Sequence, residues 1–105
     1  MGKASRDKGN RAEREIVNRH KAMGVHAQRV PLSGAVGGAY SGDVDIYVDG
    51  GEEAPLVSEV KARKSGAGFK TLEGWLGDND LLFLRRDGQD PLVVLPWETW
   101  KRLIT

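Results

Sequence analysis

The sequence has no cysteine, no long hydrophobic run and no apolar stretch near its first residue. Without cysteine, neither a disulfide framework nor a thiolate metal site can form, which fits a cytoplasmic protein. No segment approaches the roughly 20 apolar residues of a membrane-spanning helix, and residues 1–15 lack the apolar core of a secretory signal. The glycine-rich segment 32–42 has neither GxGxxG nor a GK[ST] ending, so it does not predict a nucleotide-phosphate loop.

The 105 residues, 39% hydrophobic and 30% charged, predict one globular domain, residues 1–105. Their charge is unevenly distributed. Residues 1–40 have eight Lys/Arg and three Asp/Glu, residues 41–60 have six acids and no base, and residues 61–70 have four bases and no acid. An acidic centre between basic segments is typical of a metal site within a polyanion-binding surface, although ordinary solvated charge gives the same pattern.

The periodicity of apolar residues predicts an α/β domain in the order α-β-β-β-α-β-β-α, with a mixed sheet flanked by helices. Residues 1–6 are expected to be a flexible basic arm, and Gly24 is expected to end the first helix. The two strands at 81–85 and 92–95 are continuous apolar runs, which predicts a hairpin with buried faces. The expected elements are a helix at 7–23, strands at 25–31, 43–49 and 56–63, a helix at 70–76, strands at 81–85 and 92–95, and a helix at 96–104.

The segment GDVDIYVDGGEEAPLVSEVK, residues 42–61, reads as two strands joined by a turn. Alternation places Asp43, Asp45 and Tyr47 on one face, with Val44, Ile46 and Val48 buried on the other. In an antiparallel hairpin, the positions of paired residues have a constant sum. If the turn centres on Glu52, Asp45 lies opposite Glu59, and Asp43 lies opposite Lys61.

Directly opposed Cβ atoms in a sheet are roughly 5 Å apart. Two carboxylates at that separation repel each other unless a positive charge lies between them. A Mg²⁺ ion, or Mn²⁺ in its place, is the natural occupant, because hard cations prefer oxygen ligands. Lys61 would then present an ammonium group beside the metal, where it could orient water or stabilise charge on a phosphate. The alternative is an exposed hairpin with alternating charges.

The chain resembles the PD-(D/E)XK nuclease superfamily, and more closely the archaeal-type and phage Holliday junction resolvases. The resemblance covers about residues 8–64. It depends on four segments in the same order and at similar spacing: KGNRAEREI at 8–16, RVPLSG at 29–34, DVDI at 43–46 and SEVK at 58–61. It implies a restriction-endonuclease-like fold. The superfamily's Pro-Asp pair is absent, since Val44 precedes Asp45.

The resemblance also implies roles for individual residues. Glu13, Asp45, Glu59 and the backbone carbonyl of Val60 would be the metal ligands, and Lys61 the catalytic lysine. Asp43 is a competing ligand, and Asp45 is preferred because it is expected to oppose Glu59.

Further positions correspond to groups near the DNA. Ser33 matches a serine in a loop that approaches the cleaved phosphate. Basic residues expected at the DNA backbone are Lys8, Arg11, Arg14, Arg29, Arg63 and Lys64. The three tryptophans, Trp75, Trp97 and Trp100, are interpreted as core or dimer contacts rather than as base-stacking groups.

These features predict a Mg²⁺-dependent endonuclease that acts as a homodimer, nicks a four-way junction symmetrically and leaves 5′-phosphate ends, in the host cytoplasm if a phage encodes it. No membrane or small-molecule cofactor is expected. Two alternatives stay open: a nuclease of the same superfamily that cuts flaps or ordinary duplex, and a non-catalytic DNA-binding module that has kept the fold.

Overall fold

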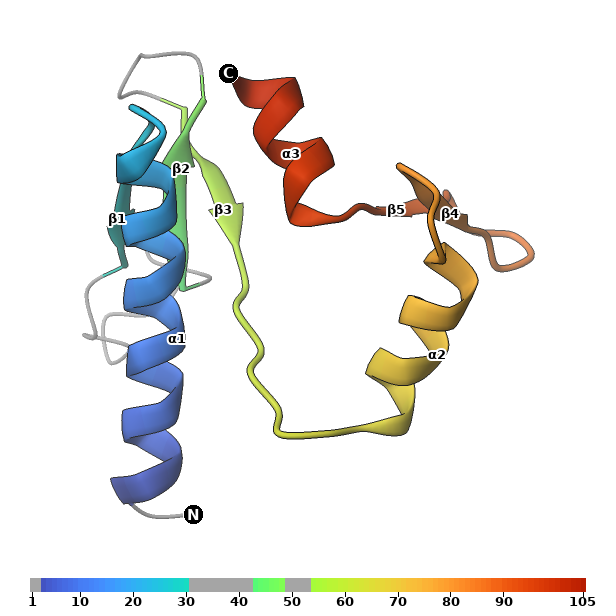
Figure 1. The fold of residues 1–105 in the computed structure, drawn as a ribbon, viewed down its shortest axis with the longest axis horizontal. Coiled ribbons are helices and arrows are strands. Elements are labelled where there is room, and N and C mark those ends of the chain that lie inside the picture. The colour runs from blue at the N-terminus through green and yellow to red at the C-terminus, as the bar shows by residue number, and fades with distance from the viewer. Residues whose placement is uncertain (1–2, 31–42, 49–53) are drawn as a thin grey trace. The chain divides into compact units, whose positions relative to one another are not determined.

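The computed structural model of the chain describes residues 3–30, 43–48 and 54–105, which form three helices and five strands (Figure 1). Their order is α-β-β-β-α-β-β-α, so the predicted α/β class and order of elements are confirmed. The chain divides into two compact units, Met1–Ala62 and Arg63–Thr105, called here the first and second units. No described helix has the length and apolar character needed to cross a membrane. The prediction of one domain stays a prediction.

The first unit begins with helix α1, Lys3–Ala22. Because this helix starts four residues before the predicted Asp7, the predicted flexible arm at residues 1–6 is wrong for residues 3–6. The helix ends as predicted, with Gly24 at a φ of 80°. The Gly24 N–H donates to the Lys21 carbonyl and the Val25 N–H donates to the His20 carbonyl, both at 3.0 Å, which closes the last turn in a Schellman motif.

Three short antiparallel strands follow, in the spatial order β1-β2-β3. They are β1, His26–Arg29, β2, Val44–Tyr47, and β3, Leu56–Ser58. The central strand β2 has the predicted alternation, with Val44 and Ile46 buried and Asp45 half-buried.

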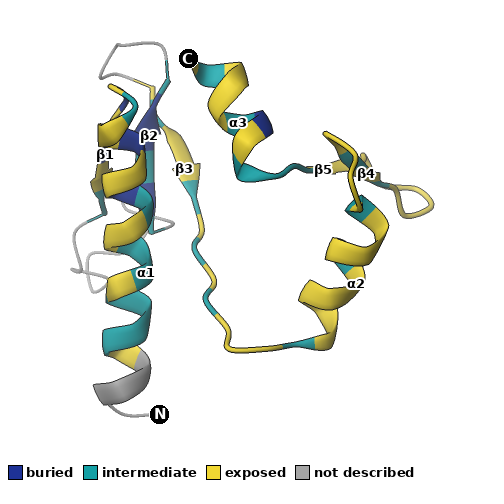
Figure 2. Ribbon diagram, viewed as in Figure 1, coloured by how far each residue is buried: buried dark blue, intermediate teal, exposed yellow. Residues whose placement is uncertain are grey.

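The core of the first unit lies between α1 and the sheet, where both contribute buried aliphatic side chains. Its members are Val17, Val25, Ala27, Val44 and Ile46. Figure 2 shows the buried positions along the ribbon. His20 is also buried, and its Nδ1 lies 2.7 Å from the Ile16 carbonyl oxygen, so Nδ1 must carry the proton. This core packs the helix against one face of the sheet. Asp45 lies on the opposite face.

Tyr47 departs from the expected pattern because it is buried on the polar face of β2. Its ring centroid lies 4.9 Å from that of His26, its partner across the ladder with β1. The Gln28 side-chain amide donates to its hydroxyl at 3.4 Å. A tyrosine buries most of its ring when neighbours cover it and its hydroxyl has a partner, so alternation alone could not predict this burial.

The second unit consists of α2, Ala67–Leu76, the antiparallel strands β4, Leu82–Leu84, and β5, Leu92–Val94, and helix α3, Trp97–Ile104. The predicted hairpin and closing helix are confirmed. The predicted burial of the hairpin is wrong, because Phe83 is 63% exposed and its cross-strand partner Val93 is 51% exposed. A two-stranded ribbon buries its faces only where another layer packs on it.

Candidate active site

The register of β2 and β3 differs from the predicted one by two residues. Asp45 pairs with Val57 and Val44 pairs with Ser58, so the predicted pairing of Asp45 with Glu59 is wrong. A shift of two residues keeps every side chain on its predicted face, because the side-chain period of a strand is two. The connecting turn sets the register, and residues 49–53 lie outside the described part of the chain.

Asp43, not Asp45, adjoins the segment that contains Glu59. Its backbone N–H donates to the Ser58 carbonyl at 2.8 Å, so the predicted pairing of Asp43 with Lys61 is also wrong. Its carboxylate Oδ2 accepts the N–H of Val60, also at 2.8 Å. Asp43 therefore holds the chain that follows β3 against the edge of β2. The geometric reason for preferring Asp45 to Asp43 as a metal ligand no longer applies.

Glu59 and Lys61 lie just beyond β3, which ends at Ser58 rather than at the predicted residue 63. The Glu59 Oε2 and Lys61 Nζ atoms are 3.1 Å apart, and the two side chains are 55% and 59% exposed. An ion pair this exposed contributes about 0–1 kcal/mol. At little cost in free energy, the Glu59 carboxylate can therefore leave Lys61 to bind a metal ion, and the Lys61 ammonium can leave Glu59 to bind a phosphate.

Glu13 and Arg29 lie together, half-buried, between α1 and β1. The Arg29 Nε donates to Glu13 Oε1 at 3.0 Å, and Nη2 donates to Asn10 Oδ1 at 2.8 Å. The side chain of Glu13 is 18% exposed and that of Arg29 is 28% exposed. We call this group of three residues the α1–β1 clasp. The predicted metal ligand and the predicted DNA contact are thus partners of each other.

The clasp and Asp45 belong to opposite faces of the sheet. Arg29 pairs with the buried Val44, whereas Gln28 pairs with Asp45. Because neighbouring residues of a strand point to opposite faces, Arg29 faces α1 and Asp45 faces away from it. The described geometry brings Glu59 to Lys61 and Asp43 to Val60, but it does not bring Glu13 to Asp45.

Within residues 3–30, 43–48 and 54–105, no three His, Cys, Asp or Glu side chains are grouped closely enough to hold a metal ion. The predicted ligands are all oxygen donors, which suit a hard divalent cation. Asp43, Asp45 and Glu59 supply carboxylate oxygens, and Val60 supplies a carbonyl on the same segment as Glu59. These donors would have to converge further to form a complete site.

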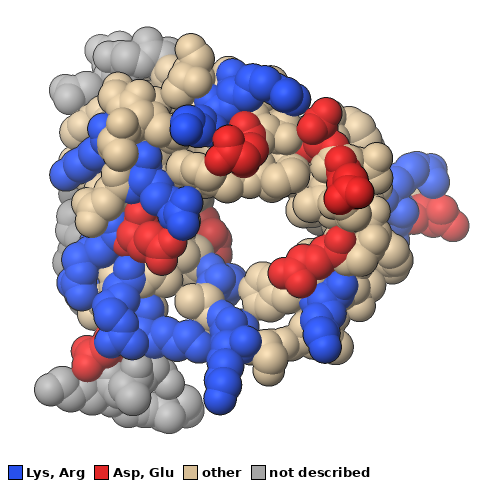
Figure 3. Space-filling model, viewed as in Figure 1, with Lys and Arg blue, Asp and Glu red and all other residues tan. Residues whose placement is uncertain are grey.

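The residues predicted to contact DNA differ in how far their side chains are exposed. Arg11 and Arg14 are exposed on α1, where a shallow depression also includes Asn18 and Arg19. On the visible face of the first unit, Lys and Arg side chains surround a small acidic group (Figure 3). Ser33 lies outside the described residues. Of the other predicted basic contacts, Lys8 is half-buried, and Arg63 and Lys64 are exposed in the second unit.

Sequence reasoning missed Asn10 as a member of the clasp. A usable signal existed, because Asn10 and Glu13 are three residues apart and residues at this spacing lie side by side on a helix. That they share one arginine from β1 depends on how α1 packs against the sheet, which the helix sequence alone does not specify.

The clasp makes a prediction about stability. Replacing Glu13 with Ala should lower the free energy of unfolding by about 1–3 kcal/mol, because it leaves the half-buried Arg29 guanidinium without its carboxylate. Glu15→Ala, two residues along the same helix, should cost only a few tenths of a kcal/mol, since the Glu15–Arg19 pair is exposed. Urea unfolding of both variants checks this. Equal losses would show that the clasp contributes no more than an exposed pair.

The model of a family described as "Phage putative PDDEXK endonuclease" matches residues 4–76, from the first turn of α1 to the end of α2. The match includes the DVDI and SEVK segments and the clasp. Among curated proteins and among solved structures, nothing matches the chain. Because the matched residues are well over half of the sequence, the chain belongs to this phage family of PD-(D/E)XK endonucleases.

Proposed function

We propose that this nuclease is a Mg²⁺-dependent, homodimeric resolvase that nicks four-way DNA junctions symmetrically and leaves 5′-phosphate and 3′-hydroxyl ends. The observation that carries the proposal is the Glu59–Lys61 pair, whose carboxylate and ammonium groups are 3.1 Å apart and accessible, in a chain of an endonuclease family. The junction as substrate is supported by the resemblance of four ordered segments to the junction resolvases. As a phage enzyme, it would act in the host cytoplasm.

Asp45 and Glu59, with the carbonyl of Val60, would hold the Mg²⁺ ion, for which Mn²⁺ could substitute. Such an ion, when bound, polarises a phosphate and makes water more acidic. Lys61 would give up its pair with Glu59 and place its ammonium group beside the phosphate, where it stabilises developing negative charge. Asp43 would keep this segment in place through the Val60 N–H. By the same resemblance, the hydroxyl of Ser33 would approach this phosphate.

The basic groups would bind DNA through its phosphates. Arg11 and Arg14 are exposed one turn apart on α1, and Arg63 and Lys64 are exposed after the site. Contacts to phosphates give affinity without reading sequence. Specificity would then come from the shape of the junction and from the spacing of two active sites in a dimer.

A dimer needs a surface that a second copy can cover. Phe83 and Val93 lie opposite each other on one face of the β4–β5 hairpin, and both are largely exposed. Exposed aromatic and aliphatic side chains that lie together are typical of protein–protein contacts. This face is the part of the second unit that best supports the proposed homodimer.

Substrate choice tests the proposal directly. Incubated with Mg²⁺, the protein should place paired, symmetric nicks in a synthetic four-way junction, and it should cut a flap and a linear duplex of the same sequence at least about tenfold more slowly. Mapping the cleaved strands on a sequencing gel gives both rate and symmetry. Equal rates on all three substrates would favour the alternative nuclease that acts on flaps or ordinary duplex.

A non-catalytic DNA-binding module is favoured by one observation, the lack of a three-ligand group among the described residues. The two functions differ in their response to metal. The nuclease should release or absorb heat on titration with Mn²⁺ and should cleave DNA when Mg²⁺ is added. DNA binding with no heat of Mn²⁺ binding and no cleavage would establish the non-catalytic module instead.

A further inference from the structure

The second unit contains a cavity of about 520 Å³ between α2 and the β4–β5 hairpin. Its apolar wall consists of Trp75, Leu84 and Leu92. Leu84 and Leu92 pair across the hairpin, so they share the face opposite Phe83 and Val93. The cavity volume is within the roughly 300–1,000 Å³ of typical small-ligand sites. None of the predicted site residues lines this cavity, so the two sites share no residue.

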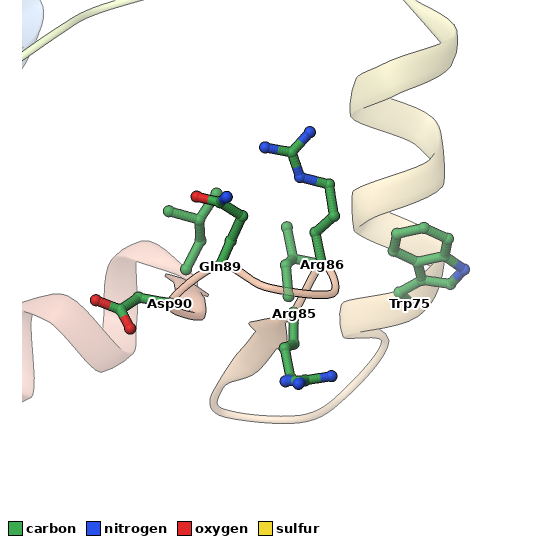
Figure 4. A pocket seen from close by; sticks show the side chains of 7 residues that line it. Trp75, Arg85, Arg86, Gln89 and Asp90 are labelled. Carbon is green, nitrogen blue, oxygen red and sulfur yellow. The ribbon is translucent and has the colours of Figure 1, made fainter.

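Trp75 differs from the other two tryptophans in its surroundings. Trp97 and Trp100 are half-buried, and each has an interaction with another group. Trp75 is 61% exposed near the C-terminal end of α2, where its indole stands at one side of the cavity (Figure 4). Of the two predicted roles, a core contact is therefore wrong for this residue, whereas a dimer contact stays a prediction. An indole exposed to this degree offers a large flat surface for a planar ligand.

The rim of the cavity is polar. Arg85 and Arg86 follow β4 and point in opposite directions, and Gln89 and Asp90 lie across from Trp75 (Figure 4). Arg85 has a 3.3 Å pair with Asp87 in which both side chains are exposed, so its guanidinium can exchange partners at little cost. For Arg86, no ion pair is found with any described residue.

We propose that this cavity binds an unpaired base of the DNA substrate. The base would stack on Trp75, the amide of Gln89 would bond its polar edge, and the guanidinium of Arg86 would contact a flanking phosphate. Proteins bind single-stranded DNA with aromatic side chains that stack on its bases and with cationic groups that contact its phosphates. This inference rests on the proposed action on DNA. The arms of a four-way junction are base-paired, so the base that enters the cavity would be one whose pairing opens at the branch point.

The test measures binding without cleavage. A short oligothymidylate is titrated into the full-length protein in EDTA, and binding is followed by fluorescence anisotropy of a labelled strand. Trp75→Ala should weaken binding about tenfold, Trp75→Phe should weaken it less because the ring can still stack, and Arg86→Gln should also weaken it. Lys101→Gln, which removes the positive charge of an exposed side chain on α3, should change it little.

A strand of the same length made of abasic sugar-phosphate units separates stacking from charge. Arg86→Gln should weaken binding of this strand, whereas Trp75→Ala should leave it unchanged. If Trp75→Ala has no effect on oligothymidylate, or affects both strands equally, the base-binding inference is overturned. It is also overturned if sedimentation shows that Trp75→Ala instead converts a dimer to a monomer, since the cavity would then be a subunit contact.

The same proteins distinguish this inference from the proposed function. Thermal unfolding followed by circular dichroism establishes that each variant is folded. If Mg²⁺-dependent cleavage is absent but Trp75→Ala weakens binding of oligothymidylate, the resolvase proposal fails and the base site stands. If the junction is cleaved and Trp75→Ala binds oligothymidylate as the unchanged protein does, the base site fails and the resolvase proposal stands.

Discussion

Replacing Glu59 with Gln should abolish Mg²⁺-dependent cleavage of a four-way junction, lowering the rate by roughly 10³-fold or more. The amide keeps the size of the side chain but removes the charge that would hold a divalent cation. It also removes the partner of Lys61, which lies 3.1 Å from the carboxylate. Because the side chain is exposed and its ion pair contributes little, the free energy of unfolding should change by less than about 1 kcal/mol.

Binding of the junction should survive this change. Measured by gel shift in Ca²⁺ or EDTA, affinity should be unchanged or slightly higher, since one negative charge near the phosphates is lost. Glu73→Gln on α2 is the matched control, an exposed glutamate changed in the same way, and it should cleave at the unaltered rate. A Glu59→Gln protein that cuts as fast as the control would remove Glu59 from the active site.

Alternation along β2 was enough to predict which side chains face α1, although not the burial of Tyr47 on the other face. Val44 and Ile46 are buried and Asp45 is not, because a strand that packs on one side must alternate. The stop at Gly24 was equally predictable, since its φ of 80° suits glycine. Both features are local, because each depends only on the conformational preferences of residues that are close in sequence.

The register of the hairpin was not predictable in the same way. Pairing Asp45 with Val57 or with Glu59 leaves all faces unchanged, so the hydrophobic pattern does not distinguish the two registers. What separates them is the geometry of the turn and the bonds of Asp43 to Ser58 and Val60. A side chain that bonds to a backbone group 17 positions away leaves no periodic signal in the sequence.

The same limit applies to the rest of the candidate site. The resemblance predicted Glu13 as a metal ligand, yet its contact with Arg29 comes from the packing of α1 on β1. The exposure of Phe83 and Trp75 also depends on whether another layer covers them. Apolar runs and motif positions thus predicted elements and candidate residues well, whereas contacts between elements required the folded chain.

The two aspartates of β2 should respond differently to the same change. Asp45→Asn should abolish cleavage of the junction and weaken binding of Mn²⁺, because the substitution removes the charge of a proposed metal ligand. Asp43→Asn should cleave within about tenfold of the unaltered rate, because the amide oxygen can still accept the Val60 N–H at the position of Oδ2. Cleavage rates and Mn²⁺ calorimetry of both variants check this.

Asp43→Ala separates the structural role of Asp43 from a role as ligand. It leaves the Val60 N–H without its acceptor, so it should cost about 1 kcal/mol of unfolding free energy and loosen the segment that holds Glu59. If Asp43 only positions this segment, Asn should preserve cleavage and Ala should reduce it. If Asp43→Asn loses Mn²⁺ binding as completely as Asp45→Asn does, Asp43 is itself a ligand, and the site is built around the acid that adjoins Glu59.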